Sequence, residues 1–202
     1  MKKLLLTGFE PFLDFPINPT MEIVNQLDGS KINDCEIIGK VLPVDFHESG
    51  EKMLAYIEEV NPDIVIALGL AAGRTKITPE RIAINCNDGP VDNRGHKPDG
   101  EPIIKEAPNG LFSTLPIKKI TARLQENGYP AEISNTAGAY LCNNVMYHAL
   151  YHFHKTDQIK PAGFIHMPAS HDLAIRHGKV PSWAQSDLIE AIHLALDTVT
   201  SI

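Results

Sequence analysis

Short apolar runs alternate along the chain with stretches of helical periodicity, which indicates strands and helices that follow one another. The predicted strands cover residues 3–7, 36–42, 63–68, 76–85, 130–134 and 162–166, and the predicted helices cover residues 46–60, 117–127, 140–154 and 182–199. A further helix is expected near Asn18, since Asn is a favourable N-cap and Pro19 suits the first helical position. This alternation predicts an α/β fold with a parallel or mixed sheet covered by helices on both faces.

The segment from residue 86 to residue 110 carries successive turn signals with little apolar periodicity between them. A loop of this length inside a compact domain is functional, forms an arm of an oligomer, or is mobile, and the sequence leaves these alternatives open. No internal repeat, low-complexity tract or linker divides the chain, so we expect residues 1–202 to form a single domain.

The charge balance limits the classes of partner. A formal net charge of −7 and a sequence pI of about 5.7 argue against nucleic acid or an anionic membrane, because no run of Lys and Arg supplies a basic patch. The first six residues imitate a signal peptide, but Gly8, Glu10 and Pro11 interrupt the apolar run, and the longest such run, residues 64–72, is too short to span a bilayer. We therefore expect a cytoplasmic protein.

Cys142 occupies the most informative stretch of the chain. Together with Cys35 and Cys86 it forms an odd set without metal-ligand spacing, as expected for reduced thiols in the cytosol. A predicted strand precedes it, Gly138 is expected in the turn, and Cys142 itself is expected in the first turn of a helix. Unpaired N–H groups and the helix dipole favour an anion there, which predicts a lowered thiol pKa and a nucleophile. The alternative is that Cys142 is a small buried hydrophobe.

His166 ends the predicted strand 162–166, on the edge of the sheet where Cys142 is expected. A histidine there suits proton transfer to and from a thiol near neutral pH. Such a pair needs a third group to orient the imidazole, and Glu80 is a candidate because a carboxylate amid an apolar strand needs a partner if it is buried. The alternative is an exposed pair of Glu80 with Arg81.

Two other patterns suggest different chemistry. His148 and His152 lie four residues apart on a predicted helix, a spacing that suits a metal, but no third ligand is evident and we expect neither a metal nor a cofactor. Residues 69–74 (Gly-Leu-Ala-Ala-Gly-Arg) are expected at the end of a strand, where they could bind a phosphate or nucleoside, but they lack the ending of a P-loop.

The chain resembles the pyroglutamyl peptidase I (pyrrolidone carboxyl peptidase) family of cytosolic cysteine peptidases. The resemblance covers nearly the whole length and rests on residues 7–12, 18–19, 69–74, 80–85, 112–117, 134–147 and 163–168. It implies a three-layer α/β/α fold with a central mixed, mostly parallel twisted sheet, a homotetramer, and removal of N-terminal pyroglutamate from peptides. It also implies that Glu80, Cys142 and His166 form the catalytic triad.

The same resemblance implies a ring pocket made by Phe9 and Phe12, with Asn18 as a polar contact and Tyr140 and Leu141 beside the nucleophile. A neutral lactam requires apolar walls and a few hydrogen-bonding groups, and a charged N-terminus would be desolvated there without a partner.

Two positions depart from the family pattern. Leu70 is also expected to bind the substrate, although many members carry Gln at this position, so that the side-chain contact made by Gln is absent here. Some members place an Arg after the position of Asp88, where this chain has Gly89 and Pro90. Neither departure touches the triad. Besides the peptidase, we keep as alternatives a phosphate- or nucleoside-binding protein that uses residues 69–74 and an inactive homologue.

Overall fold

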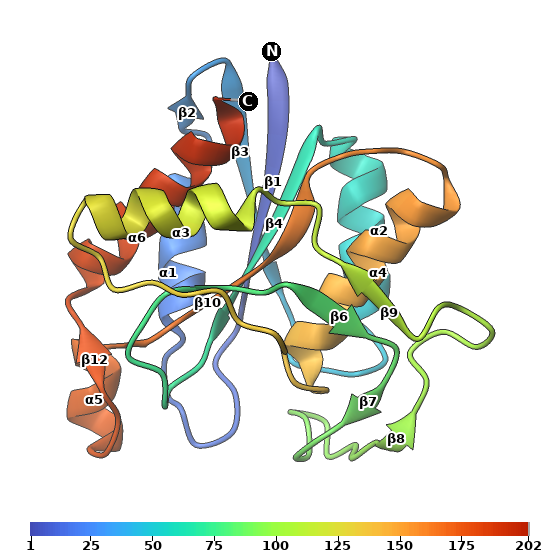
Figure 1. Ribbon diagram of the computed structural model, residues 1–202. Coiled ribbons are helices and arrows are strands. Elements are labelled where there is room, and N and C mark those ends of the chain that lie inside the picture. The colour runs from blue at the N-terminus through green and yellow to red at the C-terminus, as the bar shows by residue number, and fades with distance from the viewer. Residues whose placement is uncertain (202) are drawn as a thin grey trace.

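A six-stranded sheet forms the centre of the protein in a computed structural model that describes residues 1–201 (Figure 1). Its strands lie in the order β2 (Lys31–Ile32), β3 (Cys35–Leu42), β1 (Lys2–Phe9), β4 (Ile64–Leu70), β10 (Ala162–Met167) and β5 (Thr78–Pro79). The four inner strands are parallel, and the short strands at the two edges are antiparallel to their neighbours. The sheet is therefore mixed and mostly parallel, as predicted.

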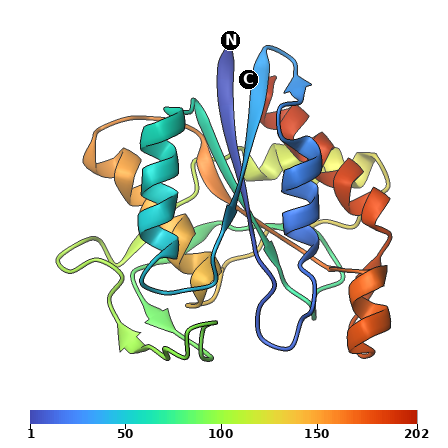
Figure 2. The same cartoon turned by 180° about the vertical axis from the view of Figure 1, so that it is seen from behind.

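Helices cover both faces of this sheet (Figures 1 and 2). One face carries α1 (Pro19–Leu27), α3 (Ile117–Glu126) and α6 (Gln185–Thr200), and the other carries α2 (Ser49–Val60) and α4 (Leu141–Lys155). The three-layer α/β/α prediction is confirmed.

Alternating side chains of the inner strands divide the core into two halves. In β10, Phe164 packs with the cluster under α2 and α4, whereas Ile165 and Met167 pack with the cluster under α1, α3 and α6. In β1, Leu5 packs with the cluster under α2 and α4, and Leu4 packs with the cluster under α1, α3 and α6. Both faces of a parallel strand are buried in this architecture, which explains why β4 is apolar along its whole length.

The predicted strand 76–85 is wrong as a single element, because the chain changes its partner at Glu80. β5 pairs with β10, the Glu80 N–H still donates to the Phe164 carbonyl, and β6 (Ile82–Ile84) then pairs with β9 (Gly110–Phe112). The predicted strand 130–134 is reduced to isolated bridges from Ala131 and Ser134.

Two further differences concern the C-terminal part. The short helix α5 (His171–His177) was not predicted, since seven residues carry too little periodicity to be recognised. The last helix begins at Gln185, three residues later than predicted, because Ser182 and Trp183 form strand β12 (Ser182–Trp183), which pairs with β11 (Ala169–Ser170).

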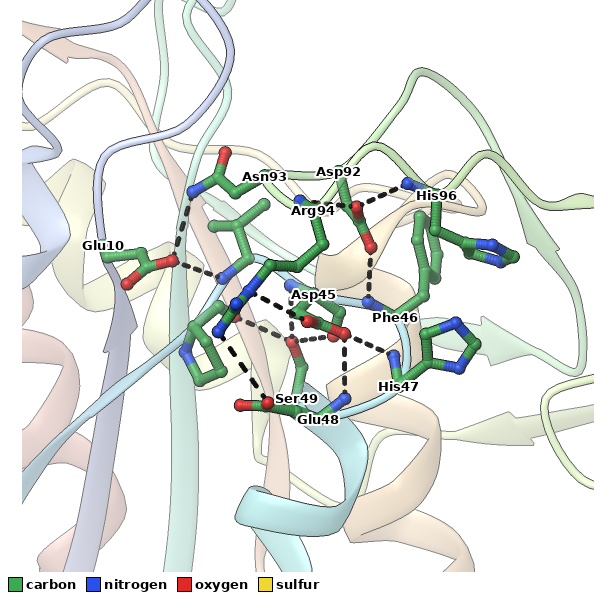
Figure 3. A network of polar contacts seen from close by, with 12 residues as sticks. Glu10, Asp45, Phe46, His47, Glu48, Ser49, Asp92, Asn93, Arg94 and His96 are labelled. Atoms are coloured by element: carbon green, nitrogen blue, oxygen red, sulfur yellow. Dashed lines mark hydrogen bonds and ion pairs between the residues drawn. The ribbon is translucent and has the colours of Figure 1, made fainter.

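The segment 86–110 contains one small ribbon, β7 (Asn87–Asp88) with β8 (Asp99–Glu101). Its middle docks against the chain that leads into α2 (Figure 3). The Asp92 carboxylate accepts hydrogen bonds from the backbone N–H groups of Phe46, Arg94 and His96. Burial opposes ionisation of Asp92, but these three donors hold its pKa below the ordinary value. The segment is thus fastened to the domain by specific contacts.

None of the helices within residues 1–201 combines the length and the apolar character that a membrane span requires.

Candidate active site

Cys142 lies in the first turn of α4, as predicted, one residue after the first helical residue Leu141. The N-cap residue is Tyr140, whose extended backbone precedes the helix and whose side chain makes no cap hydrogen bond. The first backbone bond of the helix runs from Asn144 N–H to the Tyr140 carbonyl. The N–H groups of Leu141, Cys142 and Asn143 have no acceptor among the described residues, so they are free to bind an anion.

The predicted lowering of the Cys142 pKa is wrong. Cys142 keeps some exposed surface, but the surrounding sheet and helix bury its sulfur, and this burial together with the Glu80 charge raises the thiol pKa to about 12. The Arg74 guanidinium and the backbone N–H of Cys142 act in the opposite direction without reversing the shift. Desolvation of the thiolate outweighs the helix end here, so Cys142 rests as a thiol and needs a base to become a nucleophile.

His166 lies near the carboxyl end of β10 and is buried, with 5% of its surface exposed. One ring nitrogen, Nδ1, is 2.7 Å from Glu80 Oε1. Burial lowers the pKa of His166 and outweighs the opposing effect of the Glu80 carboxylate, so the neutral imidazole is favoured. When Nδ1 carries the proton that is shared with Glu80, Nε2 carries a lone pair that can accept a proton.

Glu80 is fully buried and follows directly after β5. Its Oε1 atom accepts from His166 and from Arg74 Nη1, each at 2.7 Å, whereas its Oε2 atom has no hydrogen-bond partner in the described part of the chain. Arg81 instead donates to Asn135 at the surface. The alternative of an exposed pair of Glu80 with Arg81 is therefore wrong, and Glu80 lies where it can orient the imidazole.

Gly69 of β4 lies next to the Cys142 sulfur and beside the strand position of His166. It is in register with His166 of the neighbouring strand β10, so both residues face α4. A Cβ atom on Gly69 would lie 2.9 Å from Cys142 Sγ and 2.5 Å from the Phe164 ring, whose centroid is 4.7 Å from that of His166. The absence of a side chain at Gly69 thus lets the nucleophile approach the sheet beside His166.

A small pocket opens beside Cys142. Its lining is almost entirely apolar and consists of Phe9, Phe12, Asn18, Val44, Leu70, Tyr140, Leu141 and Cys142. All six residues expected to bind the substrate therefore lie in one cavity next to the expected nucleophile.

Among the described residues, Asn18 is the only amide side chain in this lining, and most of its hydrogen-bonding groups are already engaged. Its Oδ1 atom accepts from the N–H and hydroxyl groups of Thr20, as an N-cap of α1 does, and Nδ2 donates to the Glu10 carbonyl. One N–H of the Asn18 amide remains available to a ligand.

Three residues of the site were not recognised from the sequence. Val44 lines the pocket just beyond the carboxyl end of β3, a position from which it could have been inferred. Arg74 was considered as an anion-binding residue and instead pairs with Glu80. Asn143 fastens α4 to β6 through three hydrogen bonds, to the Ile84 N–H and to the carbonyls of Ile84 and Cys86, which no local pattern indicates.

The structure does not support the metal site considered at His148 and His152 or the anion site considered at residues 69–74. No three His, Cys, Asp or Glu side chains within residues 1–201 converge to hold a metal ion, and the His148 ring lies against Gly50. Arg74, the one cationic residue of the segment 69–74 considered as an anion site, has its guanidinium engaged by Glu80, by the Thr78 hydroxyl and by the Thr136 carbonyl.

Comparison with known proteins agrees with this geometry. The model of the family described as pyroglutamyl peptidase matches residues 2–201. A pyrrolidone-carboxylate peptidase from Oceanobacillus iheyensis is 59% identical over 97% of this chain and 98% of its own length. Solved structures of pyrrolidone carboxyl peptidases from Pyrococcus furiosus and Thermococcus litoralis have sequences that are 46% and 41% identical to this chain. The Pyrococcus furiosus match covers 98% of this chain and 98% of that protein's chain, and the Thermococcus litoralis match covers 100% and 94%. Each structure superimposes on this one with a TM-score of 0.95. The chain therefore belongs to the pyroglutamyl peptidase family of cysteine hydrolases.

Proposed function

We propose that this protein is a cysteine omega-peptidase that hydrolyses the amide bond after an N-terminal pyroglutamyl residue, with Cys142 as nucleophile, His166 as general base and acid, and Glu80 as the group that orients His166. The observation that carries the proposal is the small apolar pocket that opens beside Cys142, together with the hydrogen-bonded Glu80–His166 pair, whose His166 is in register with Gly69 next to the Cys142 sulfur. Relatives of high identity bear the name pyrrolidone-carboxylate peptidase, which agrees with that chemistry.

Acylation begins from the neutral pair. Because the pKa of Cys142 is raised and that of His166 is lowered, the resting site holds a thiol and a neutral imidazole. His166 takes the thiol proton as the sulfur attacks the pyroglutamyl carbonyl carbon, so a C–S bond forms and the carbonyl oxygen becomes negative. Glu80 holds the imidazole in one tautomer and stabilises the imidazolium.

The oxyanion is stabilised by the start of α4. The free N–H groups of Leu141, Cys142 and Asn143 and the positive end of the helix lie where negative charge develops during attack by Cys142. Loss of one such donor lowers the rate of an acyl transfer by about 10²-fold or more.

The second half of the reaction returns His166 to its neutral form. The imidazolium gives its proton to the departing amine as the C–N bond breaks, which leaves a pyroglutamyl thioester on Cys142. A water molecule then loses a proton to His166 and attacks the thioester, and the sulfur leaves with a proton. The products are free pyroglutamate and a peptide that is shorter by one residue.

Specificity follows from the lining of the pocket. Phe9, Phe12 and Leu70 offer apolar surface to a lactam ring, and the remaining N–H of Asn18 offers one hydrogen bond. An unblocked N-terminus would lose its hydration there without meeting a carboxylate, since no Asp or Glu among residues 1–201 lines the pocket. The site therefore favours the cyclic, uncharged N-terminus.

A chromogenic pyroglutamyl amide tests this function. The wild-type protein should release the chromophore, Cys142→Ser should lose activity by several orders of magnitude, and Glu80→Gln should lose less because an orienting group contributes less than the nucleophile. Tight binding of the amide without turnover by the wild-type protein would favour an inactive homologue. Equal rates for wild type and Cys142→Ser would remove Cys142 from the mechanism.

The proposal extends to assembly and location. We propose one catalytic domain over residues 1–202, a homotetramer and a cytoplasmic site of action. The site supports a single domain because it combines residues of β1, β4, β10 and α4. The three free cysteines suit a reducing compartment, and the exposed Phe112 offers apolar surface for self-association. Light scattering on the purified protein measures the assembly, and a monomer at micromolar concentration would contradict the tetramer.

A further inference from the structure

Arg74 is a charged group at the reaction centre that the mechanism above does not use. Its Nη1 atom lies 2.7 Å from Glu80 Oε1 and also donates to the Thr78 hydroxyl, and its Nη2 atom donates to the Thr136 carbonyl at 3.3 Å. We propose that Arg74 is a positioning residue for the hydrolysis, because its guanidinium holds the Glu80 carboxylate against His166 and fastens the segment that leads into Cys142. This inference rests on the proposed function.

The first part of the inference concerns the Glu80 carboxylate. Burial of a carboxylate is costly unless an opposite charge and hydrogen bonds compensate it, and Glu80 is fully buried. Arg74 is the only guanidinium or ammonium group within 4.0 Å of Glu80 among residues 1–201. Since Glu80 Oε2 has no hydrogen-bond partner among residues 1–201, Oε1 alone makes the hydrogen bonds to Arg74 and His166. Without Arg74, the carboxylate would be free to turn away from the imidazole.

The second part concerns the backbone around the site. Arg74 closes a turn after β4 through its N–H, which donates to the Ala71 carbonyl. Its guanidinium then reaches β5 through Thr78 and the loop before α4 through Thr136, six residues ahead of Cys142. One side chain thus connects three segments, and these segments carry the pocket wall, the carboxylate and the nucleophile. A lysine has one nitrogen and cannot reproduce this fork.

The charge of Arg74 also balances that of Glu80. Burial lowers the pKa of His166, Glu80 raises it, and Arg74 lowers it again. Burial and Glu80 raise the pKa of Cys142, and Arg74 lowers it. Removal of Arg74 would leave the Glu80 charge uncompensated, so the pKa of both His166 and Cys142 would move upward. His166 would then be protonated at pH values at which the wild-type imidazole is neutral, and a protonated imidazole cannot act as the base.

The experiment measures kcat/KM for a chromogenic pyroglutamyl amide as a function of pH. For Arg74→Met we expect a loss of about 10- to 100-fold at the optimum, the size expected when a catalytic group is misplaced, and an acid limb that moves to higher pH. Arg74→Lys keeps the charge, so its acid limb should stay near that of the wild type. The matched control is Arg81→Met, which removes a cation from the residue next to Glu80 and should leave kcat/KM unchanged.

A double-mutant cycle separates positioning from direct contact with the substrate. In a Glu80→Gln background, Arg74→Met should cost less than in the wild-type background, because there is no carboxylate left to hold and only the contacts with Thr78 and Thr136 are lost. Equal losses in both backgrounds, or a wild-type acid limb in Arg74→Met, would overturn the inference. Arg74→Gln serves as a second neutral variant, and the position of the limb does not depend on how much of the variant is folded.

A measurement without turnover keeps this inference distinct from the proposed function. Alkylation of Cys142 by iodoacetamide follows the thiolate, so Arg74→Met should require a higher pH than the wild type for the same rate. A wild-type protein that fails to cleave the amide would contradict the proposed function alone. Identical alkylation profiles for the two proteins would contradict the role of Arg74, whatever the activity.

Discussion

The two faces of the sheet are built from the same strands but contain different chemistry. The face under α1, α3 and α6 has a core of aliphatic side chains. The face under α2 and α4 combines an apolar core with buried polar groups, including His166, Asn143 and Asn144. Neighbouring residues of β10 illustrate the difference, since Ile165 belongs to the first face and His166 to the second.

The difference shows on which face of the sheet polar and charged side chains are buried at a cost in stability. A histidine and a carboxylate in the interior reduce stability unless each has a partner, and here they are partnered by each other and by Arg74. The aliphatic face needs no such arrangement and contributes stability through apolar burial. Substitutions on the two faces should therefore have separable effects on activity and on stability.

The largest contrast is expected between the adjacent residues His166 and Ile165. His166→Ala should lower kcat/KM by about 10³-fold or more in the folded protein, because it removes the base. Ile165→Ala should lower the free energy of unfolding by about 2–5 kcal/mol and leave kcat/KM of the folded protein within a few-fold. Activity assays and urea unfolding measure the two effects. A large loss of activity in folded Ile165→Ala would show that the faces are coupled.

An intermediate contrast is expected between Gly69 and Gly163, which lie on opposite faces. A Cβ atom at Gly69 would meet Cys142 Sγ and the Phe164 ring, whereas one at Gly163 would meet Ser113 Oγ at 2.4 Å and the Leu115 side chain. Gly69→Ala should therefore displace the nucleophile and lower kcat/KM by about 10²-fold.

The matched variant Gly163→Ala should lower the free energy of unfolding by about 1–3 kcal/mol through overpacking, with kcat/KM close to that of the wild type. Thermal unfolding and steady-state kinetics on both variants make the comparison. If both variants lost activity equally after correction for folded protein, the effect at Gly69 would come from general distortion of the sheet.

The smallest effect concerns pH. Burial lowers the pKa of both His166 and His148 in the folded protein, so the unfolded chain binds more protons below pH ~6.5. The free energy of unfolding should therefore decrease as the pH falls from about 6.5 through the folded pKa values. The acid limb of kcat/KM should lie below the usual range of a histidine, because His166 acts in its neutral form.

One variant separates the contributions of the two histidines. His148→Gln should reduce the dependence of stability on pH and leave the acid limb of kcat/KM where it is, since His148 packs against Gly50 away from the pocket. Urea unfolding at several pH values and pH-rate profiles give the two readouts. If the acid limb of kcat/KM moved in His148→Gln, the limb would reflect the protonation of His148, and its assignment to His166 would be wrong.

Much of the site could be predicted from positions along the chain. The strand that ends near His166 and the turn that precedes Cys142 are local patterns, and parallel strands bring their carboxyl ends to one edge. The direction of the Cys142 pKa shift could not be predicted in this way, because the helix end is a local feature whereas burial depends on the segments that pack around it. The partners of Arg74 were missed for the same reason.

Hydrophobic periodicity and turn chemistry act over a few neighbouring residues, so the amino-acid sequence sufficed to predict the main alternation of strands and helices, the burial of both faces of the sheet and the residue types at its carboxyl edge. The break of the strand at Glu80, the space that Gly69 leaves for the sulfur and the pairing of Arg74 with Glu80 are visible only in the folded chain. These features depend on contacts between residues distant in the chain, and such contacts exist only after the layers have packed.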